Sequence, residues 1–126
     1  MARDFRQLVV WQLADELQTM TLELTRTGPW ARDFELCNEA LKTTSQICRN
    51  ITEGFRRHSH KEFARFLEYC EGSTGELRSL FNDAQKCGYA TAQQLQPARN
   101  ILYRLERALR GLITYLRRNP PPPWWN

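Results

Sequence analysis

The sequence predicts an all-α protein, built as an antiparallel up-down-up-down four-helix bundle with left-handed packing. Apolar residues recur at the three- and four-residue steps of one helical face in four successive segments. The connections between these segments are short, which favours antiparallel neighbours. The chain has 126 residues, of which 41% are hydrophobic, so it is large enough for one core and too small for two. We therefore expect a bundle over residues 1–118 and a Pro- and Trp-rich tail over residues 119–126.

The first two helices are predicted on either side of Gly28-Pro29, a pair that ends a helix. The first helix presents one apolar face, made by Leu13, Ala14, Leu17, Met20, Thr21 and Leu24. The second spans roughly 33 to 57 and turns inward Leu36, Ala40, Thr43, Ile47, Ile51 and Phe55. Gly54 weakens the last turn of this helix, because glycine is a poor helix former. A tight connection follows at His58.

The third helix is predicted to begin at His60, because Ser59 and Glu62 have the spacing of a capping box. Its inward residues are Phe63, Phe66, Leu67, Cys70, Thr74, Leu77, Phe81 and Ala84. Gly88 is placed to close it as a left-handed cap. Three small residues interrupt it, Gly72, Ser73 and Gly75. They indicate either the close approach of another helix or a tolerated weak spot.

The fourth helix has the clearest heptad pattern in the chain. Its apolar residues alternate three- and four-residue steps: Leu95, Ala98, Leu102, Leu105, Leu109, Leu112 and Leu116. Thr91 and Gln94 offer a second capping box. Pro97 would remove a hydrogen bond from the sixth helical position, so we expect the continuous helix to begin nearer residue 96.

Three sequence blocks carry a resemblance to a known family. They are Phe5, Leu8, Val10, Trp11, Gln12 and Ala14; Asn50-Ile51-Thr52-Glu53-Gly54; and Ser59-His60-Lys61-Glu62-Phe63-Ala64-Arg65-Phe66-Leu67, which continues to Gly72-Ser73-Thr74-Gly75-Glu76-Leu77. The chain resembles the four-helix bundle proteins encoded in intervening sequences of large-subunit ribosomal RNA genes. Their distant relatives include accessory proteins of diversity-generating retroelements.

The resemblance implies the same bundle and a homo-oligomer, with a pentameric ring around a central channel favoured. For the motif residues it implies a structural role: Asn50, Glu53, Gly54, Ser59, Glu62, Phe63 and Arg65. Asn50 and Glu53 can share one helix edge, where we expect hydrogen bonding first. The chain departs from the family upstream, where Asn38-Glu39-Ala40-Leu41-Lys42 replaces a common basic pair. That departure weakens any contact of the second helix with nucleic acid.

The net charge of +4 is concentrated on the fourth helix. Residues 92–118 hold one acid, Glu106, and six arginines: Arg99, Arg104, Arg107, Arg110, Arg117 and Arg118. All six fall on the side opposite the leucine stripe. Because arginine holds phosphate oxygens bidentately, this face predicts binding to the backbone of RNA or DNA. A solvated face, or one that pairs with acids of a neighbouring subunit, is the alternative.

A second basic cluster surrounds the junction of the second and third helices. Its members are Arg49, Arg56, Arg57, His58, His60, Lys61 and Arg65, with Glu53, Glu62 and Glu68 among them. The mixture of signs favours a salt-bridged hairpin. Nucleic-acid contact by Arg56, Arg57 and Lys61 is the sharper alternative.

The sequence does not predict an enzyme, a metal site or a cofactor. A di-iron bundle needs inward glutamates and two E-x-x-H pairs, and neither His58 nor His60 has a glutamate three residues earlier. The four cysteines, Cys37, Cys48, Cys70 and Cys87, lack a C-x-x-C pair and are expected to be reduced thiols in or beside the core. No apolar run approaches the ~20 residues that span a bilayer. We expect a cytoplasmic protein with no membrane partner.

Two functions from different classes remain open. One is a non-enzymatic, oligomeric accessory protein that binds nucleic acid; the other is an adaptor oligomer whose basic face meets an acidic protein, such as a reverse transcriptase. Subunit contacts are expected from apolar residues outside the core stripes: Val9, Trp11, Trp30 and Tyr103. Four prolines predict a polyproline II tail. Its two tryptophans are expected to dock on protein, with stacking on a base as the alternative.

Overall fold

The computed structural model describes residues 2–121 and 123–125, except for the side chain of residue 124. Four long helices form the body: α1 (Val9–Arg26), α2 (Phe34–Arg56), α3 (His60–Lys86) and α4 (Ala92–Arg118). Short 3-10 turns flank them: η1 (Phe5–Gln7), η2 (Gly28–Arg32) and η3 (Pro123–Trp125). The described residues contain no strand.

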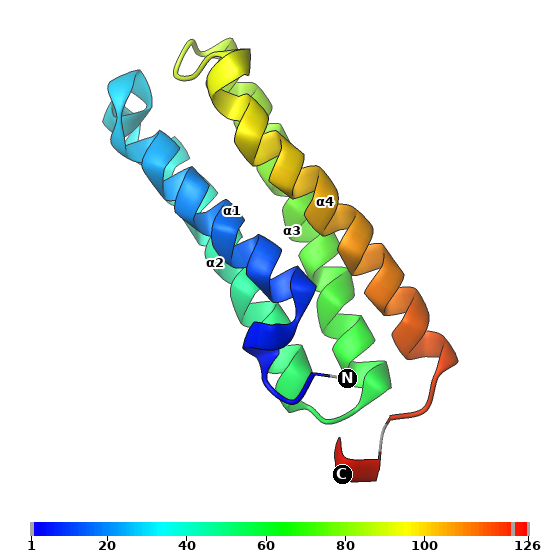
Figure 1. Ribbon diagram of the computed structural model, residues 1–126. Coiled ribbons are helices and arrows are strands. Elements are labelled where there is room, and N and C mark those ends of the chain that lie inside the picture. The colour runs from blue at the N-terminus through cyan, green and yellow to red at the C-terminus, as the bar shows by residue number, and fades with distance from the viewer. Residues whose placement is uncertain (1, 122, 126) are drawn as a thin grey trace.

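The helices lie side by side in one antiparallel bundle (Figure 1). Each packs against its neighbours in the chain, and α1 also packs against α4, which closes the ring of four. An even number of antiparallel helices returns the chain to its starting end, so η1 and η3 both lie at the end where α2 meets α3 (Figure 1). The predicted four-helix bundle is confirmed.

The helix boundaries agree with the predictions except at the start of α4. Ser59 caps α3, its Oγ accepting from the amide of Glu62 at 3.2 Å, but the Glu62 carboxylate bonds Arg65 and does not complete the box. Both halves of the predicted box between Thr91 and Gln94 are present, at 3.0 and 2.8 Å. The expected start near residue 96 is wrong, because this box begins the helix at Ala92 and it continues through Pro97.

The turns use the backbone conformations that their residues allow. Gly88 ends α3 with φ +75°, the left-handed value predicted for it. The tight turn between α2 and α3 places His58 at φ 51°, which is uncommon for a residue other than glycine. The turn between α3 and α4 is tied to the start of α2, because the Tyr89 hydroxyl donates to Asp33 Oδ2 at 2.9 Å. The Leu36 amide and this hydroxyl lower the pKa of Asp33.

The close approach of two helices is at Gly54, not at the small residues of α3. A Cβ built on Gly54 would lie 2.7 Å from Phe66 Cβ and 3.0 Å from Phe63 Cδ1, whereas one built on Gly72 or Gly75 meets nothing within 4 Å. Of the two alternatives for Gly72 and Gly75, the close approach is therefore wrong, and the tolerated weak spot agrees with the open space around them. Gly54 is the residue that lets α2 and α3 come together.

Two tryptophans lie inside the structure. Trp30, on η2, was expected at a subunit contact, but it is fully buried and meets Phe81 edge to face. Trp125 docks on the same chain and is 2% exposed, against Phe55 and Phe63. The prediction of polyproline II is wrong for Pro123–Trp125, which forms a 3-10 turn. Pro122, Asn126 and the Trp124 side chain lie outside the described residues.

Trp125 is held beside His60, which is buried rather than the polar turn residue expected. His60 Nδ1 lies 2.7 Å from the carbonyl oxygen of Asn119 and must donate to it, since a carbonyl can only accept. The His60 and Trp125 rings meet edge to face, with centroids 5.2 Å apart. The start of the tail is thus fastened to the first turn of α3.

All four cysteines are free thiols. Cys37 and Cys70 are buried, Cys48 is half-buried and Cys87 is exposed. Burial raises the pKa of Cys48 to about 11 and that of Cys70 to about 12. These two thiols are therefore protonated near neutral pH and are poor nucleophiles.

We expect iodoacetamide at pH 8 to alkylate the folded protein first at Cys87. Cys48 and Cys70 should react only after denaturant unfolds the chain, because the thiolate is the reactive form and burial suppresses it. Peptide mass spectrometry over a time course measures the order. Labelling of Cys70 as fast as Cys87 in the folded protein would contradict the buried position of Cys70.

Candidate nucleic-acid interface

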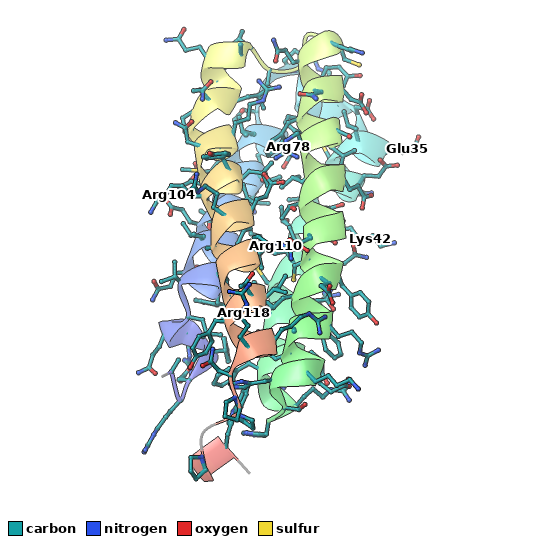
Figure 2. All side chains as sticks on the ribbon, turned by 90° about the vertical axis from the view of Figure 1, so that its right-hand side faces the viewer. Glu35, Lys42, Arg78, Arg104, Arg110 and Arg118 are labelled. Atoms are coloured by element: carbon teal, nitrogen blue, oxygen red, sulfur yellow. The ribbon has the colours of Figure 1, made fainter. Side chains whose placement is uncertain are left out.

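The six arginines of α4 divide into two rows. At about 100° per residue, Arg104, Arg107 and Arg118 lie within about 60° of one another, opposite the buried stripe. We call these three the outer row. The other three lie about 100° further round the helix, toward α3: Arg99, Arg110 and Arg117. Figure 2 shows Arg110 between α4 and α3 and Arg104 on the other side of α4.

The row beside α3 is engaged by side chains of that helix. Arg110 pairs with Glu71 and Arg117 with Glu68, while Arg78 of α3 pairs with Glu106 of α4. Arg99 donates to the amide oxygens of Gln85 and Asn82, both at 2.8 Å. The nearly all-cationic face expected for α4 is thus partly neutralised. The acids come from another helix, which the charge count of α4 alone could not show.

The outer row has no carboxylate partner among the described residues. The side chains of Arg104 and Arg118 make no hydrogen bond or ion pair there. Arg107 donates to the Tyr103 hydroxyl at 3.1 Å, and that bond raises the pKa of Arg107. Arg104 and Arg118 are fourteen residues apart, about 21 Å along the helix at 1.5 Å per residue. The row therefore presents a line of cations along an exposed face.

The second basic cluster contains the salt bridges expected of it, each within one helix of the hairpin. Arg57 pairs with Glu53 at 3.1 Å, both at the end of α2, and Arg65 pairs with Glu62 at 2.9 Å within α3. The Arg65 guanidinium lowers the pKa of Glu62. The side chains of Arg56 and Lys61 form no hydrogen bond or ion pair with any described residue. Both remain exposed cations.

The motif residues have unequal surroundings. Gly54 and Phe63 are buried where α2 meets α3, and Ser59 caps α3. Glu53 has its ion pair with Arg57. The Asn50 side chain is half-buried and makes no hydrogen bond within the described residues, so the side-chain bonding expected of it has no partner there.

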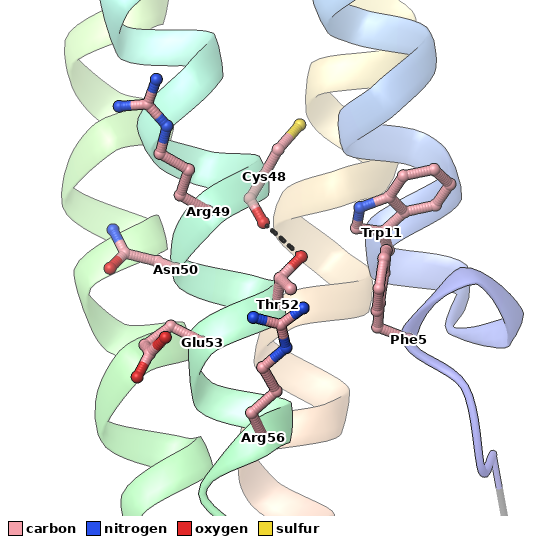
Figure 3. A pocket seen from close by; sticks show the side chains of 8 residues that line it. All are labelled: Phe5, Trp11, Cys48, Arg49, Asn50, Thr52, Glu53 and Arg56. Atoms are coloured by element: carbon pink, nitrogen blue, oxygen red, sulfur yellow. Dashed lines mark hydrogen bonds between the residues drawn. The ribbon is translucent and has the colours of Figure 1, made fainter.

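A hollow that the charge pattern did not predict lies between η1 and α2 (Figure 3). Its volume is about 610 Å³, and its lining consists of Phe5, Trp11, Cys48, Arg49, Asn50, Thr52, Glu53 and Arg56. The hollow thus brings together two of the sequence blocks that carry the family resemblance, the block with Phe5 and Trp11 and the block with Asn50 and Glu53. A seven-residue recurrence of cations, Lys42, Arg49 and Arg56, was the signal that could have identified this face of α2.

No group of three or more His, Cys, Asp and Glu side chains among the described residues can hold a metal ion. None of the helices in this part of the chain is long and apolar enough to cross a bilayer.

Comparison with known proteins gives one family. The sequence model of the 23S rRNA-intervening sequence protein family matches residues 6–111. No curated protein matches the chain.

Proposed function

Because the chain belongs to the 23S rRNA-intervening sequence protein family, we propose that it is a non-enzymatic cytoplasmic protein that binds the phosphate backbone of RNA or DNA. The outer row of α4 is the contact surface in this proposal. One observation carries it: the three guanidiniums of the outer row share an exposed face, and none of them pairs with a carboxylate of the described residues. A guanidinium without an acidic partner keeps its donors for phosphate oxygens.

In this proposal the protein recognises the negative charge of the nucleic acid and not its base sequence. Phosphate contacts fix the position of a protein on nucleic acid and carry no base information. They also release counterions, so affinity must fall steeply as salt rises. The test uses both a structured RNA and a DNA duplex.

We expect the change of Arg104, Arg107 and Arg118 to glutamate to abolish binding to both nucleic acids. The glutamine triple removes the same positive charges without adding negative ones, and should lower the slope of log affinity against log salt by about 2 to 3, since each phosphate contact contributes about 0.7–0.9. Fluorescence anisotropy over a salt series measures both. Retained binding by the glutamate triple would rule out the outer row.

The matched control changes Arg99, Arg110 and Arg117 to glutamine. It removes the same number of charges from the same helix, but these side chains are engaged by Gln85, Asn82, Glu71 and Glu68. Its salt slope should change by less than half as much as that of the outer-row triple. Equal losses in the two triples would mean that total charge, and not the outer row, determines binding.

We also propose a homo-oligomer, with a pentamer as the expected form. Large apolar side chains on the surface support it: Phe34 is 76% exposed and Val9 is 60% exposed. The outer-row variants should assemble as the unchanged protein does, because none of their three positions is apolar. Light scattering gives the mass. A monomeric mass at micromolar concentration would contradict the proposed oligomer, but it would not contradict the proposed binding surface on α4.

The second candidate function is an adaptor for an acidic protein, such as a reverse transcriptase. The outer row favours it as well, since a carboxylate surface offers the same geometry to arginine as phosphate does. The two functions separate in the same titration. Absence of polynucleotide binding at low salt selects the adaptor.

A further inference from the structure

The hollow between η1 and α2 has an aromatic side. The Phe5 and Trp11 rings stand edge to face, with centroids 5.3 Å apart, and both are half-buried. The Arg6 guanidinium lies 5.4 Å from the centre of the Phe5 ring and is paired with Asp4. Figure 3 shows the two rings on one side of the hollow and the side chains of α2 on the other.

The opposite side of the hollow is cationic. Arg49 and Arg56 are seven residues apart, so they share one face of α2 within about 20° and are separated by about 10.5 Å along it. Neither forms a hydrogen bond or ion pair with a described residue. Glu53, which lies between them in the sequence, is engaged by Arg57 at 3.1 Å. The excess charge at the hollow is therefore positive.

One polar group at the rim has both hydrogen-bonding functions available. The Asn50 side chain is half-buried and has no partner within the described part of the chain. An amide offers a carbonyl acceptor and two N–H donors. It can therefore bond a ligand that presents donors and acceptors together, such as the edge of a base or a ribose.

We infer that this hollow holds an unpaired nucleotide of a single strand. The base lies against Phe5 and Trp11, and the phosphates on either side of it meet Arg49 and Arg56. The inference rests on the proposed function and adds to it the strandedness of the ligand. A duplex keeps its bases stacked inside, so it cannot place a base against the rings and does not bring its phosphates to the two guanidiniums of the hollow.

The physical properties of the hollow favour this occupant over others. Its volume of about 610 Å³ lies in the range of small-molecule sites, about 300–1,000 Å³. Aromatic rings combined with a basic groove are the means by which proteins bind single strands without sequence preference. An apolar helix from a second copy would leave two guanidiniums unmatched, and an acidic peptide would leave the rings unmatched.

The test measures affinity for a short oligouridylate and for an RNA duplex of equal length. The Arg49→Gln/Arg56→Gln variant should lose at least tenfold in affinity for the single strand and less than threefold for the duplex. Both side chains are exposed and unpartnered, so the fold should not change. Equal single-strand affinity in variant and unchanged protein would overturn the inference.

A ring variant tests the aromatic side separately. Trp11→Leu should weaken single-strand binding by about 5- to 150-fold, the range for loss of one stacked base, while Trp11→Phe should retain most of it. The urea midpoint of each variant is recorded, because Trp11 is half-buried. Equal losses for leucine and phenylalanine, with folding intact, would exclude stacking.

The outer-row triple distinguishes this inference from the proposed function. If that triple loses both ligands and the hollow variants lose neither, the backbone contact stands and the nucleotide site is wrong. If the hollow variants lose only the single strand and the triple loses neither ligand, the site stands and the α4 surface is wrong. A fall in oligomer mass in the Arg49→Gln/Arg56→Gln variant would assign the hollow to a second copy and overturn the inference.

Discussion

Trp30→Ala is expected to lower the free energy of unfolding by about 3–5 kcal/mol, the range for removing a fully buried large aromatic side chain. Trp30 has no exposed surface and meets Phe81 edge to face with ring centroids 6.4 Å apart. Its carbonyl also accepts from the Cys37 thiol at 3.0 Å, which joins η2 to α2. Removal of the indole leaves a cavity at the end of the bundle remote from the termini, where η2 connects α1 and α2.

Urea denaturation followed by circular dichroism measures the change. Tyr103→Ala is the control, because Tyr103 is 57% exposed and surface substitutions usually stay within about 0.5 kcal/mol. A Trp30→Ala variant as stable as Tyr103→Ala would mean that Trp30 does not lie in the core. Trp30 would then return to the subunit surface that the sequence predicted for it.

Gly54→Ala should destabilise the protein by about 1–3 kcal/mol, the usual cost of overpacking. The cost arises although alanine is the better helix former by about 1 kcal/mol. The new methyl would lie 2.7 Å from Phe66 Cβ, an atom fixed to the α3 backbone, so α2 and α3 must separate. The urea midpoint measures the loss.

Gly72→Ala and Gly75→Ala are the matched controls for this substitution. Both glycines lie within α3, and the added methyl meets nothing within 4 Å. Each control should therefore stabilise the protein by up to about 1 kcal/mol through helix propensity alone. Glycine-to-alanine substitution is thus expected to lower the free energy of unfolding at Gly54 and to raise it at Gly72 and Gly75. Stabilisation at all three glycines would show that α2 and α3 are not in close contact.

The sequence predicted the fold because apolar period and capping chemistry are local. The steps through Leu95, Leu102 and Leu109 identify α4 without knowledge of any other helix, and Ser59 identifies the start of α3. Pro97 does not delay the start of α4, because the complete capping box at Thr91 stabilises the first turn ahead of it. A proline near an exposed helix start removes one bond, and a well-capped helix tolerates that loss.

The features that the sequence did not predict depend on distant residues. Glycine in a helix reads as a weakness until a facing helix is known, and Gly54 is required only because Phe66 lies opposite. In the same way, Arg110 reads as a free cation until Glu71 of α3 is seen beside it. Arg104 and Arg107 kept the surroundings expected of an exposed face because α3 does not reach that side of α4.

The candidate hollow was missed for a related reason. Phe5 and Arg56 are far apart in the chain, and only the packing of α1 against α2 brings them together. Lys42, Arg49 and Arg56 recur every seven residues in the sequence, but the acids between and beside them make the cationic face difficult to recognise from the sequence alone. Glu53 pairs with Arg57, so it does not neutralise Arg49 or Arg56.

The order in which the helices pack along the chain also influences how fast the protein folds. Among the four helices, each meets its sequence neighbour, and α1–α4 is the one pair that joins helices distant in the chain. Most native contacts therefore close short loops, which is the low contact order of proteins that fold within microseconds to milliseconds. The α1–α4 pair closes the longest loop and carries the largest entropic cost. We therefore expect contacts between helices adjacent in the chain to form before the contact between α1 and α4 that completes the bundle.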